Sequence, residues 1–363
     1  MASGRRIYEL IRTSISHRPK RVRRERAETL VDEGLDWSAV QEAAARHGVL
    51  PLFLHNLNGL LGGYLPESLR DQIRDRRRRA QVRAAFLSGE LGRVSQLFRD
   101  ESLPVLALKG PTLAQRAYGD VAMRNYIDLD IFVPREQFSE ADRLLQSIGY
   151  EHSSDKQKLT GWRKKLALYI FGQWQFRRKK GALDIDLHTR VMPPGYTLTA
   201  DFRPFWERSR SLQLQKDATV KAFAPEDMVL ILAHHGIKNQ WRALKYVADL
   251  GGLIRGVPDL DWSVLIRRAR RMDSAGVLKL GLRVTQDLLS TPYPEDIQTW
   301  IGKPEDAISE SIRKHLRNQS QDTTLPLGRR LQLHLRTKDT VMSGVRYGLY
   351  SIARHIWSTA LKP

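Results

Sequence analysis

The chain has 363 residues, no cysteine and a formal net charge of +20. Its length allows a substantial core, and the lack of cysteine excludes disulfides, a thiol nucleophile and a thiolate metal site. No uninterrupted apolar run is long enough to cross a bilayer, and the first residues lack the apolar stretch of a secretory signal, so we expect a cytoplasmic protein. The basic charge favours a polyanionic partner, such as nucleic acid, nucleotides or anionic lipid. A generally basic surface without a dedicated partner is the alternative.

The first hundred residues are predicted to be helical after a basic start. Residues 1–26 are rich in arginine and lysine and carry little apolar content, which is typical of a flexible arm or a solvated helix. Residues 27–100 follow helical spacing. We expect a long helix over residues 67–98, with apolar side chains that recur at helical intervals and form one buried stripe. That stripe consists of Val82, Phe86, Leu91, Val94 and Phe98.

The middle of the chain changes to a mixed pattern. Short apolar runs bounded by Gly, Pro or charged residues predict strands, and amphipathic runs predict helices. We expect strands over residues 104–108, 127–133, 168–177 and 183–188, and helices over residues 112–118 and 136–148. Residues 101–200 are therefore predicted to form a core around a small mixed sheet.

The remainder of the chain again shows helical spacing. Helices are expected over residues 225–236, 241–253, 262–271 and 276–289. Residues 341–363 are expected to form an amphipathic helix that packs against the domain, with binding to a membrane surface as the alternative because the helix is basic and carries Trp357. The whole pattern predicts an α+β protein in which a small mixed β-sheet core is flanked by N-terminal and C-terminal helical regions. The predicted divisions are a basic arm at 1–26, a helical region at 27–100, the core at 101–200 and a second helical region at 201–363.

Two aspartates alternate with a leucine in the strand predicted over residues 127–133. On a strand, residues two apart share a face, so Leu129 points into the core while Asp128 and Asp130 point the same way. Side-by-side carboxylates repel each other unless cations lie between them, and a pair of Mg²⁺ ions about 3.5–4 Å apart would remove that cost. The motif alone is a weak signal, because many strands carry two aspartates on a solvated face.

A second acidic strand strengthens this interpretation. Residues 183–188 place Asp184, Asp186 and His188 on one face and apolar residues on the other. If the two acidic strands are neighbours in one sheet, their carboxylates converge on a single pocket, where His188 either contacts the substrate or packs structurally. The alternative is two ordinary half-exposed strands, although exposed strand faces more often carry Thr, Lys and Arg than aspartates.

A phosphate-binding turn is predicted shortly before the first acidic strand. Gly110 would let backbone amides approach a phosphate closely, and the start of the following helix adds its dipole. Lys109 supplies a positive charge suited to a β- or γ-phosphate. Arg116 and Arg124 lie between this turn and Asp128, where each would either clamp a phosphate or lie on the surface.

These motifs, in this order, resemble the uncharacterised nucleotidyltransferase family of the polymerase-beta superfamily. The resemblance spans roughly residues 27–290 and combines motifs that are individually weak. It lies in residues 35–37, 46–49 and 108–114, in Tyr118 and Arg124, in residues 127–133 and 186–188, and in His235, Gly236, Trp241 and Asp249.

The resemblance implies a small mixed sheet flanked by helices, with Mg²⁺ held by Asp128, Asp130 and a third carboxylate from a neighbouring strand. By its position just before Leu187 and His188, Asp186 matches that third carboxylate, and Asp184 is the reserve candidate. For His235 the residues favour a histidine of the helix core or a cap, while its match to a family position leaves open a role near the acceptor.

One motif departs from the general superfamily, which has a Gly-Ser pair where this chain has Lys109-Gly110-Pro111. The departure is shared with toxin-type nucleotidyltransferases of abortive-infection systems, whose motif carries Lys-Gly-Gly. Pro111 replaces the second glycine and removes one backbone donor from the phosphate cradle.

Together these residues predict a Mg²⁺-dependent nucleotidyltransferase. It would transfer a nucleoside monophosphate from an NTP, ATP among the candidates, to an acceptor hydroxyl and release pyrophosphate. The basic charge favours RNA as the acceptor, for example a tRNA end, with residues 1–26 and 76–79 contacting phosphates. Protein, peptide and small-molecule acceptors stay open, as does a toxin-like role. The alternative from another class is a catalytically silent nucleic-acid-binding module, although carboxylates without ions would repel phosphate.

Overall fold

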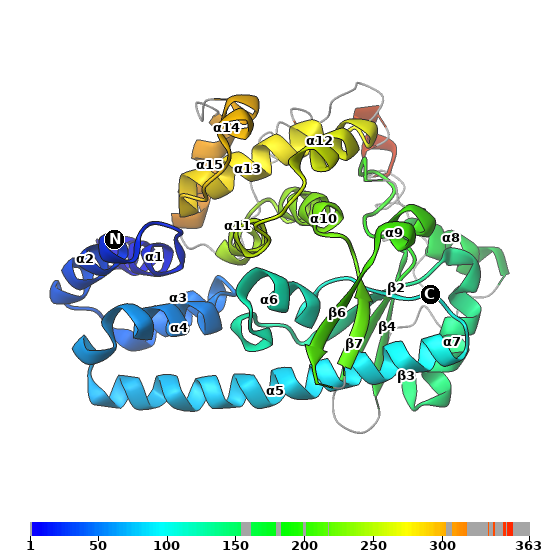
Figure 1. Cartoon of the computed structure of the whole chain (residues 1–363), viewed down its shortest axis with the longest axis horizontal. Helices are drawn as coiled ribbons and strands as arrows, with labels where there is room; N and C mark the ends of the chain where they lie inside the picture. Colours follow the sequence, from blue (N-terminus) through cyan, green and yellow to red (C-terminus); the bar gives the residue numbers. More distant parts are fainter. Residues whose placement is uncertain are drawn as a thin grey trace.

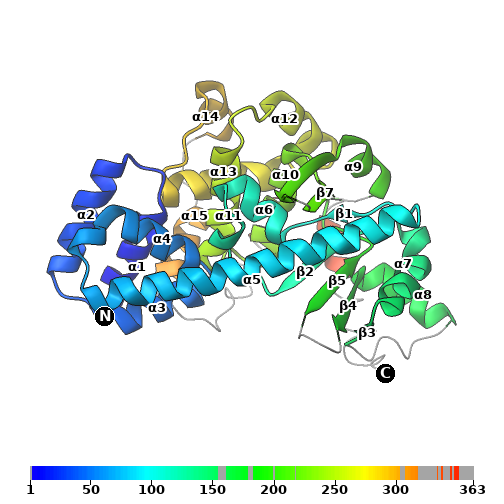
Figure 2. The same ribbon diagram turned by 60° about the horizontal axis from the view of Figure 1, so that its bottom comes forward.

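The computed structural model describes residues 2–153, 161–178, 183–198, 201–216, 218–302 and 307–317, together with residues 333, 337, 344, 345 and 347–350. The described chain contains one mixed β-sheet with helices packed around it. The long helix α5 (Glu67–Asp100) runs from a group of N-terminal helices to the sheet (Figure 1, Figure 2). The α+β class predicted from the sequence, with a mixed sheet between helical regions, is confirmed.

The sheet has the strand order β3-β4-β5-β2-β1-β7-β6. The strands are β1 (Leu106–Ala107), β2 (Asp128–Phe132), β3 (Tyr150–His152), β4 (Gln173–Arg178), β5 (Asp184–His188), β6 (Arg210–Gln215) and β7 (Ala218–Ala222). β2 is parallel to β5 and antiparallel to β1, while β1 is parallel to β7. The two strands with acidic motifs, β2 and β5, are therefore direct neighbours in the middle of the sheet.

The N-terminal helices are α1 (Ala2–Ile15), α2 (Lys20–Asp32), α3 (Trp37–Arg46) and α4 (Leu50–Leu61). Residues 2–26 are thus not a free arm, and Leu10 and Ile11 of α1 are fully buried. Apolar residues recur at helical spacing among the arginines, so α1 packs one face against α2, α3 and α4. The prediction of a flexible arm is corrected accordingly, whereas the alternative of a solvated helix describes residues 20–26 at the start of α2, all of which except Arg23 are exposed.

Helix α5 confirms the long helix predicted over residues 67–98, but part of its buried stripe is wrong. Val82 is 66% exposed and Phe86 is 53% exposed. The predicted Leu91, Val94 and Phe98 are buried, and Ala84 and Leu87 complete the buried face in place of Val82 and Phe86. A helix turns by about 100° per residue, so a contact surface that includes Leu87 directs Phe86 away from the sheet.

Two segments of the sheet region differ from the sequence-based prediction. Residues 168–171 end helix α8 (Gly161–Phe171) rather than begin a strand, and Gly172 has a φ of +59° that breaks the helix before β4. The hairpin of β6 and β7 lies where only helices were expected. Its strands are short and rich in polar residues, so their alternation is weak, but β7 gains a place in the sheet by pairing with β1.

Further helices cover the sheet and the site described below. They are α6 (Gly110–Tyr118), α7 (Phe138–Ser147), α9 (Phe202–Arg208), α10 (Pro225–Lys238), α11 (Leu244–Gly256), α12 (Trp262–Arg271), α13 (Ala275–Leu289), α14 (Glu295–Ile301) and α15 (Ala307–Arg317). The four helices predicted between residues 225 and 289 are confirmed as α10 to α13. Most of the helix predicted over residues 341–363, including residues 351–363, lies outside the described residues.

Nothing in the described part of the chain meets the length and hydropathy that a membrane-crossing helix requires. The division of the chain at residues 100 and 200 remains a prediction.

Candidate active site

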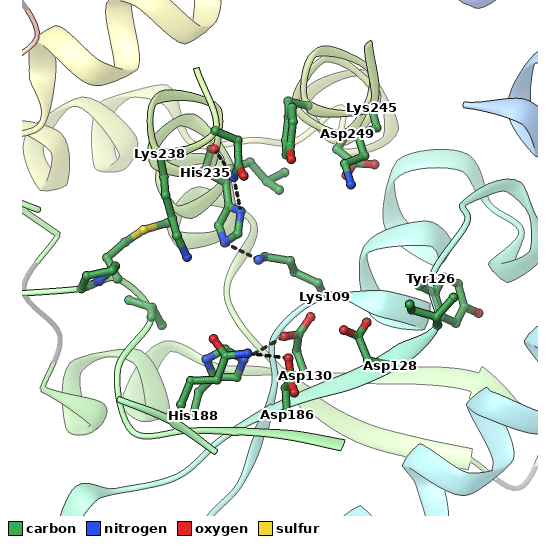
Figure 3. A pocket seen from close by; sticks show the side chains of 18 of the residues that line it. Lys109, Tyr126, Asp128, Asp130, Asp186, His188, His235, Lys238, Lys245 and Asp249 are labelled. Atoms are coloured by element: carbon green, nitrogen blue, oxygen red, sulfur yellow. Dashed lines mark hydrogen bonds and ion pairs between the residues drawn. The ribbon is translucent and has the colours of Figure 1, made fainter. Parts of the chain in front are cut away.

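A pocket of about 450 Å³ lies between the central strands β2 and β5 and the helices α10 and α11. Its floor carries Asp128 and Asp130 from β2 with Asp186 from β5, and α10 contributes His235 on the opposite side (Figure 3). The pocket therefore collects side chains from parts of the chain that are far apart in sequence.

The pairing of β2 with β5 explains why the carboxylates converge. In this parallel ladder Asp130 lies beside Asp186, and Leu129 between the two β2 aspartates is buried. Residues two apart on a strand share a face, so Asp128 points into the same pocket as Asp130 (Figure 3). The register of β2 and β5 therefore brings Asp128, Asp130 and Asp186 into one pocket.

His188 belongs to this carboxylate group. Ligand atoms of Asp130, Asp186 and His188 all lie within 4.8 Å of one another, a spacing that suits a shared metal ion. His188 Nε2 donates to Asp130 Oδ1 at 2.8 Å. The period-two pattern of β5 had placed His188 on the acidic face, but contact with Asp130 depends on the β2–β5 register.

The carboxylates differ in their electrostatic surroundings. Burial would raise the pKa of Asp130, but the hydrogen bond from His188 and the charge of Lys109 outweigh it and hold that pKa well below its usual range. Burial raises the pKa of Asp186 to about 6, and the neighbouring aspartates add to the rise. Burial and Asp130 also raise the pKa of Asp128. The ionised forms of Asp128 and Asp186 are thus destabilised by their surroundings.

Asp184, the reserve candidate, is turned to another partner. Its carboxylate accepts hydrogen bonds from Arg177 Nε at 2.8 Å and from Arg177 Nη2 at 2.9 Å. Arg177 lies directly opposite on β4, so the β4–β5 pairing supplies this ion pair. Asp184 is not among the residues that line the pocket, whereas Asp186 is.

Lys109 enters the pocket from the turn before α6. It is buried, and its Nζ contacts Nε2 of His235 (Figure 3). Burial lowers the pKa of Lys109 to about 8, with Lys238 and Arg124 adding to the fall and Asp130 opposing it. Burial, and then Lys109 itself, hold the pKa of His235 well below its usual value. His235 is therefore neutral at physiological pH and can accept a hydrogen bond from the Lys109 ammonium.

Gly110, beside this lysine, has a φ of +54°, a conformation that favours glycine. A side-chain carbon added there would lie 3.8 Å from the carbonyl oxygen of Asp128. The turn therefore passes close to the start of the acidic strand.

The two candidate phosphate-binding arginines have different positions. Arg124 lines the pocket but is tied to Asp249 of α11, with both carboxylate oxygens 3.0 Å from its Nε. Arg116 is not brought to the pocket. It donates to the carbonyl of Phe223 and lines a separate cavity between α6 and α11 with Tyr118 and Gly252.

Three further cations line the pocket and did not stand out in the sequence. They are Arg190, Lys238 and Lys245. Lys238 lies one helical turn after His235 on α10, which is a spacing that shares a face. Arg190 follows β5, and its guanidinium lies 4.8 Å from the centre of the Tyr169 ring. The pocket is thus acidic on its floor and cationic around its walls.

The sequence matches the model of a family described as uncharacterised nucleotidyltransferase over residues 33–290, which is more than half of the chain. The chain belongs to this family. No curated protein matches it. One similar solved structure is an antigenic nucleotidyltransferase-like protein from Paracoccidioides brasiliensis, with 16% identity, a TM-score of 0.31, and coverage of 53% of this chain and 92% of that one.

The carboxylate pocket of this family member fits a bound metal ion. Asp186 Oδ1 is buried and has no hydrogen-bond partner among the described residues, while Oδ2 accepts from Gln173 Nε2 at 2.5 Å. A buried carboxylate oxygen without a partner is costly. A divalent cation would satisfy it and would also neutralise the repulsion among the aspartates. Asp130, Asp186 and His188 thus form a possible metal site.

We expect Asp186→Asn to stabilise the metal-free protein at neutral pH. The folded-state pKa of about 6 lies above the ordinary value of 3.8, so folding favours the protonated carboxyl. Ionised Asp186 therefore lowers the free energy of unfolding. This destabilisation is absent below about pH 4, grows as the pH rises toward 6 and stays at about 2–3 kcal/mol above pH 6. Asparagine keeps an oxygen for Gln173 but removes the charge.

Denaturant unfolding in EDTA measures this effect. At pH 7.5 the variant should be more stable than wild type, at pH 5 the difference should shrink, and added Mg²⁺ should stabilise wild type much more than the variant. A variant that is less stable than wild type at both pH values would show that the Asp186 charge is not strained in the metal-free fold.

Proposed function

We propose that this protein is a metal-dependent nucleotidyltransferase that moves a nucleoside monophosphate from an NTP to the hydroxyl of an RNA acceptor. The observation that carries the proposal is the pairing of Asp130 with Asp186 on adjacent parallel strands, with a buried Asp186 oxygen that lacks a partner among the described residues. Asp128 faces the same pocket. Carboxylates held together in this way suit two-metal phosphoryl chemistry.

In this proposal Asp128, Asp130 and Asp186 hold Mg²⁺, with two ions expected. The ions would supply charge neutralisation for the triphosphate and for the attacking and leaving oxygens. His188 positions Asp130 through the 2.8 Å hydrogen bond and keeps its carboxylate ionised. The net reaction joins the acceptor oxygen to the α-phosphorus, breaks the bond to pyrophosphate and releases the hydroxyl proton.

The cationic walls are proposed to bind the nucleotide. Lys109 contributes an ammonium aimed into the pocket, and His235 orients it by accepting its hydrogen bond. Gly110 lets the turn approach the ligand, and the start of α6 adds a favourable dipole. Arg124 is fixed by Asp249, so it adds positive potential rather than a mobile clamp. Positioning and charge complementarity of this kind account for most catalysis in phosphoryl transfer.

RNA is the proposed acceptor because the chain carries a net charge of +20. The Lys109-Gly110 motif, similar to that of toxin-type nucleotidyltransferases, predicts the same chemistry in a different biological setting. Protein, peptide and small-molecule acceptors are alternative outcomes of the test below.

The test is incubation of the purified protein with Mg²⁺, each α-³²P-labelled NTP and an extract containing total RNA and protein. The control is the Asp128→Ala/Asp130→Ala variant. Label in an RNA band that is lost in the control is the expected result. Label in a protein band would change the acceptor. No label with any NTP, while the protein still binds RNA, would favour a catalytically silent binding module.

A further inference from the structure

A second pocket, of about 290 Å³, lies next to the carboxylate pocket. It is formed by α4, the first half of α5 and the short helix η2 (Val121–Met123), which contact one another. Its floor is apolar and consists of Leu50, Pro51, Leu54, Ile73, Ala80, Ala122 and Met123. His55 and Asn58 of α4 add polar groups to the same lining. None of these residues has a role in the proposed nucleotidyl transfer.

The two pockets share a wall. Asn125, which is exposed, lines both of them. Before Asn125 in the chain, Ala122 and Met123 line the second pocket. After it, Tyr126 and Asp128 line the carboxylate pocket. The two pockets therefore adjoin at Asn125, on the side of the carboxylate pocket that Tyr126 and Asp128 line.

The second pocket carries four arginines of α5, Arg74, Arg76, Arg77 and Arg79, and Asp120 is the one acid among its described lining residues. Ile73, Arg76, Arg77 and Ala80 are spaced three, four and seven residues apart on α5, so they share one helix face. Arg74 pairs with Asp71, but within the described residues no acid pairs with Arg76 or Arg77. An apolar slot beside unpaired guanidinium groups is complementary to a ligand that combines a flat ring with phosphates. A purely apolar partner would instead bury those charges without compensation.

From this charge complementarity we infer that the second pocket binds the 3′-terminal nucleotide of an RNA acceptor. The base lies in the apolar slot, the adjacent phosphates contact Arg76 and Arg77, and the terminal hydroxyl extends past Asn125 toward the carboxylates. The inference rests on the proposed nucleotidyl transfer, for which it supplies the acceptor site. It also assigns a role to arginines whose side chains do not reach the carboxylate pocket.

The first experiment compares neighbouring arginines on α5. Binding of a 5′-fluorescein-labelled single-stranded RNA is followed by anisotropy over a range of salt concentrations, in EDTA and without NTP. Arg77→Ala should weaken binding several-fold and reduce the salt slope by about 1, because one phosphate contact is lost. Arg78→Ala removes the same charge from an exposed position that does not line the pocket, so its slope should stay unchanged. Equal losses in both variants would overturn the inference.

The second experiment fills the slot without changing charge. Ala80 is half-buried in the pocket lining, so Ala80→Leu should occupy the space proposed for the base. We expect roughly tenfold weaker binding of linear RNA, equivalent to about 1.4 kcal/mol, with an unchanged salt slope and a wild-type thermal melt. A circular RNA of equal length, which has no 3′ end, should bind wild type and Ala80→Leu alike. Wild-type affinity of Ala80→Leu for linear RNA would refute the terminal-nucleotide site.

These binding measurements need neither metal nor NTP, so they separate the inference from the proposed reaction. Weaker RNA binding by the Arg77→Ala and Ala80→Leu variants would support the acceptor pocket even if no nucleotidyl transfer were detected. Conversely, Ala80→Leu that labels RNA with an unchanged KM for the RNA would overturn the pocket assignment and leave nucleotidyl transfer intact.

Discussion

Asp130→Asn is expected to lower nucleotidyl transfer by a factor on the order of 10³ or more, because one metal-binding carboxylate contributes several kcal/mol of transition-state stabilisation. Asp130 lies between Asp128 and His188 in the pocket and is held ionised by its surroundings. Asparagine has the same shape and can still accept the hydrogen bond from His188. The fold should therefore persist, and the loss should appear in kcat with α-labelled NTP as substrate.

The matched control for this prediction is Asp184→Asn, the same substitution on the neighbouring strand. Asp184 is paired with Arg177, whose side chain is 61% exposed, and does not line the pocket. Exposed ion pairs contribute about 0–1 kcal/mol, so this variant should keep near wild-type activity and stability. If both variants lost activity equally, the third carboxylate of the site would have to be reassigned. If Asp130→Asn stayed active, the metal-site assignment would be wrong.

Asp249→Ala is expected to lower the free energy of unfolding by about 3–5 kcal/mol, because it leaves a buried guanidinium without its partner. The side chains of Arg124 and Asp249 are only 16% and 7% exposed, and Tyr118 Oη also lies 3.4 Å from the Asp249 carboxylate. Burial by itself would lower the pKa of Arg124, but Asp249 raises it above its usual value. Chemical denaturation followed by circular dichroism measures the loss.

Two variants test whether the unpaired charge causes this loss. Arg124→Met/Asp249→Leu replaces the ion pair with apolar groups of similar volume and should recover much of the stability. Glu207→Ala removes the exposed i,i+4 partner of Arg203 and should change stability by less than about 1 kcal/mol. An Asp249→Ala variant no less stable than Glu207→Ala would mean that water or another group satisfies Arg124 in the folded protein.

The spacing of residues within a single strand or helix was enough to predict part of the site. The alternation in residues 127–133 and 183–188 places Asp128, Asp130 and Asp186 on strand faces whatever lies beside them. The helical period likewise predicted α5 and α10 to α13.

Other features could not be predicted from the spacing of residues within one element. The hairpin of β6 and β7 is defined by its pairing with β1 rather than by a strong alternation of its own. The phase of α5, which exposes Phe86 and buries Leu87, depends on the sheet against which the helix packs. The burial of the N-terminal helix α1 depends on α2, α3, α4 and α13, which contact it from other parts of the chain.

By itself the sequence determined which residues share a face on the two acidic strands, and the order of the motifs predicted the family. The tertiary structure alone decided which of those faces meet. It turned Asp184 to Arg177, brought His188 to Asp130 and joined Lys109 to His235. It also took Arg116 away from the pocket and tied Arg124 to Asp249. The physical reason is that periodicity is a property of neighbours in the chain, whereas strand register and buried ion pairs depend on contacts between distant residues.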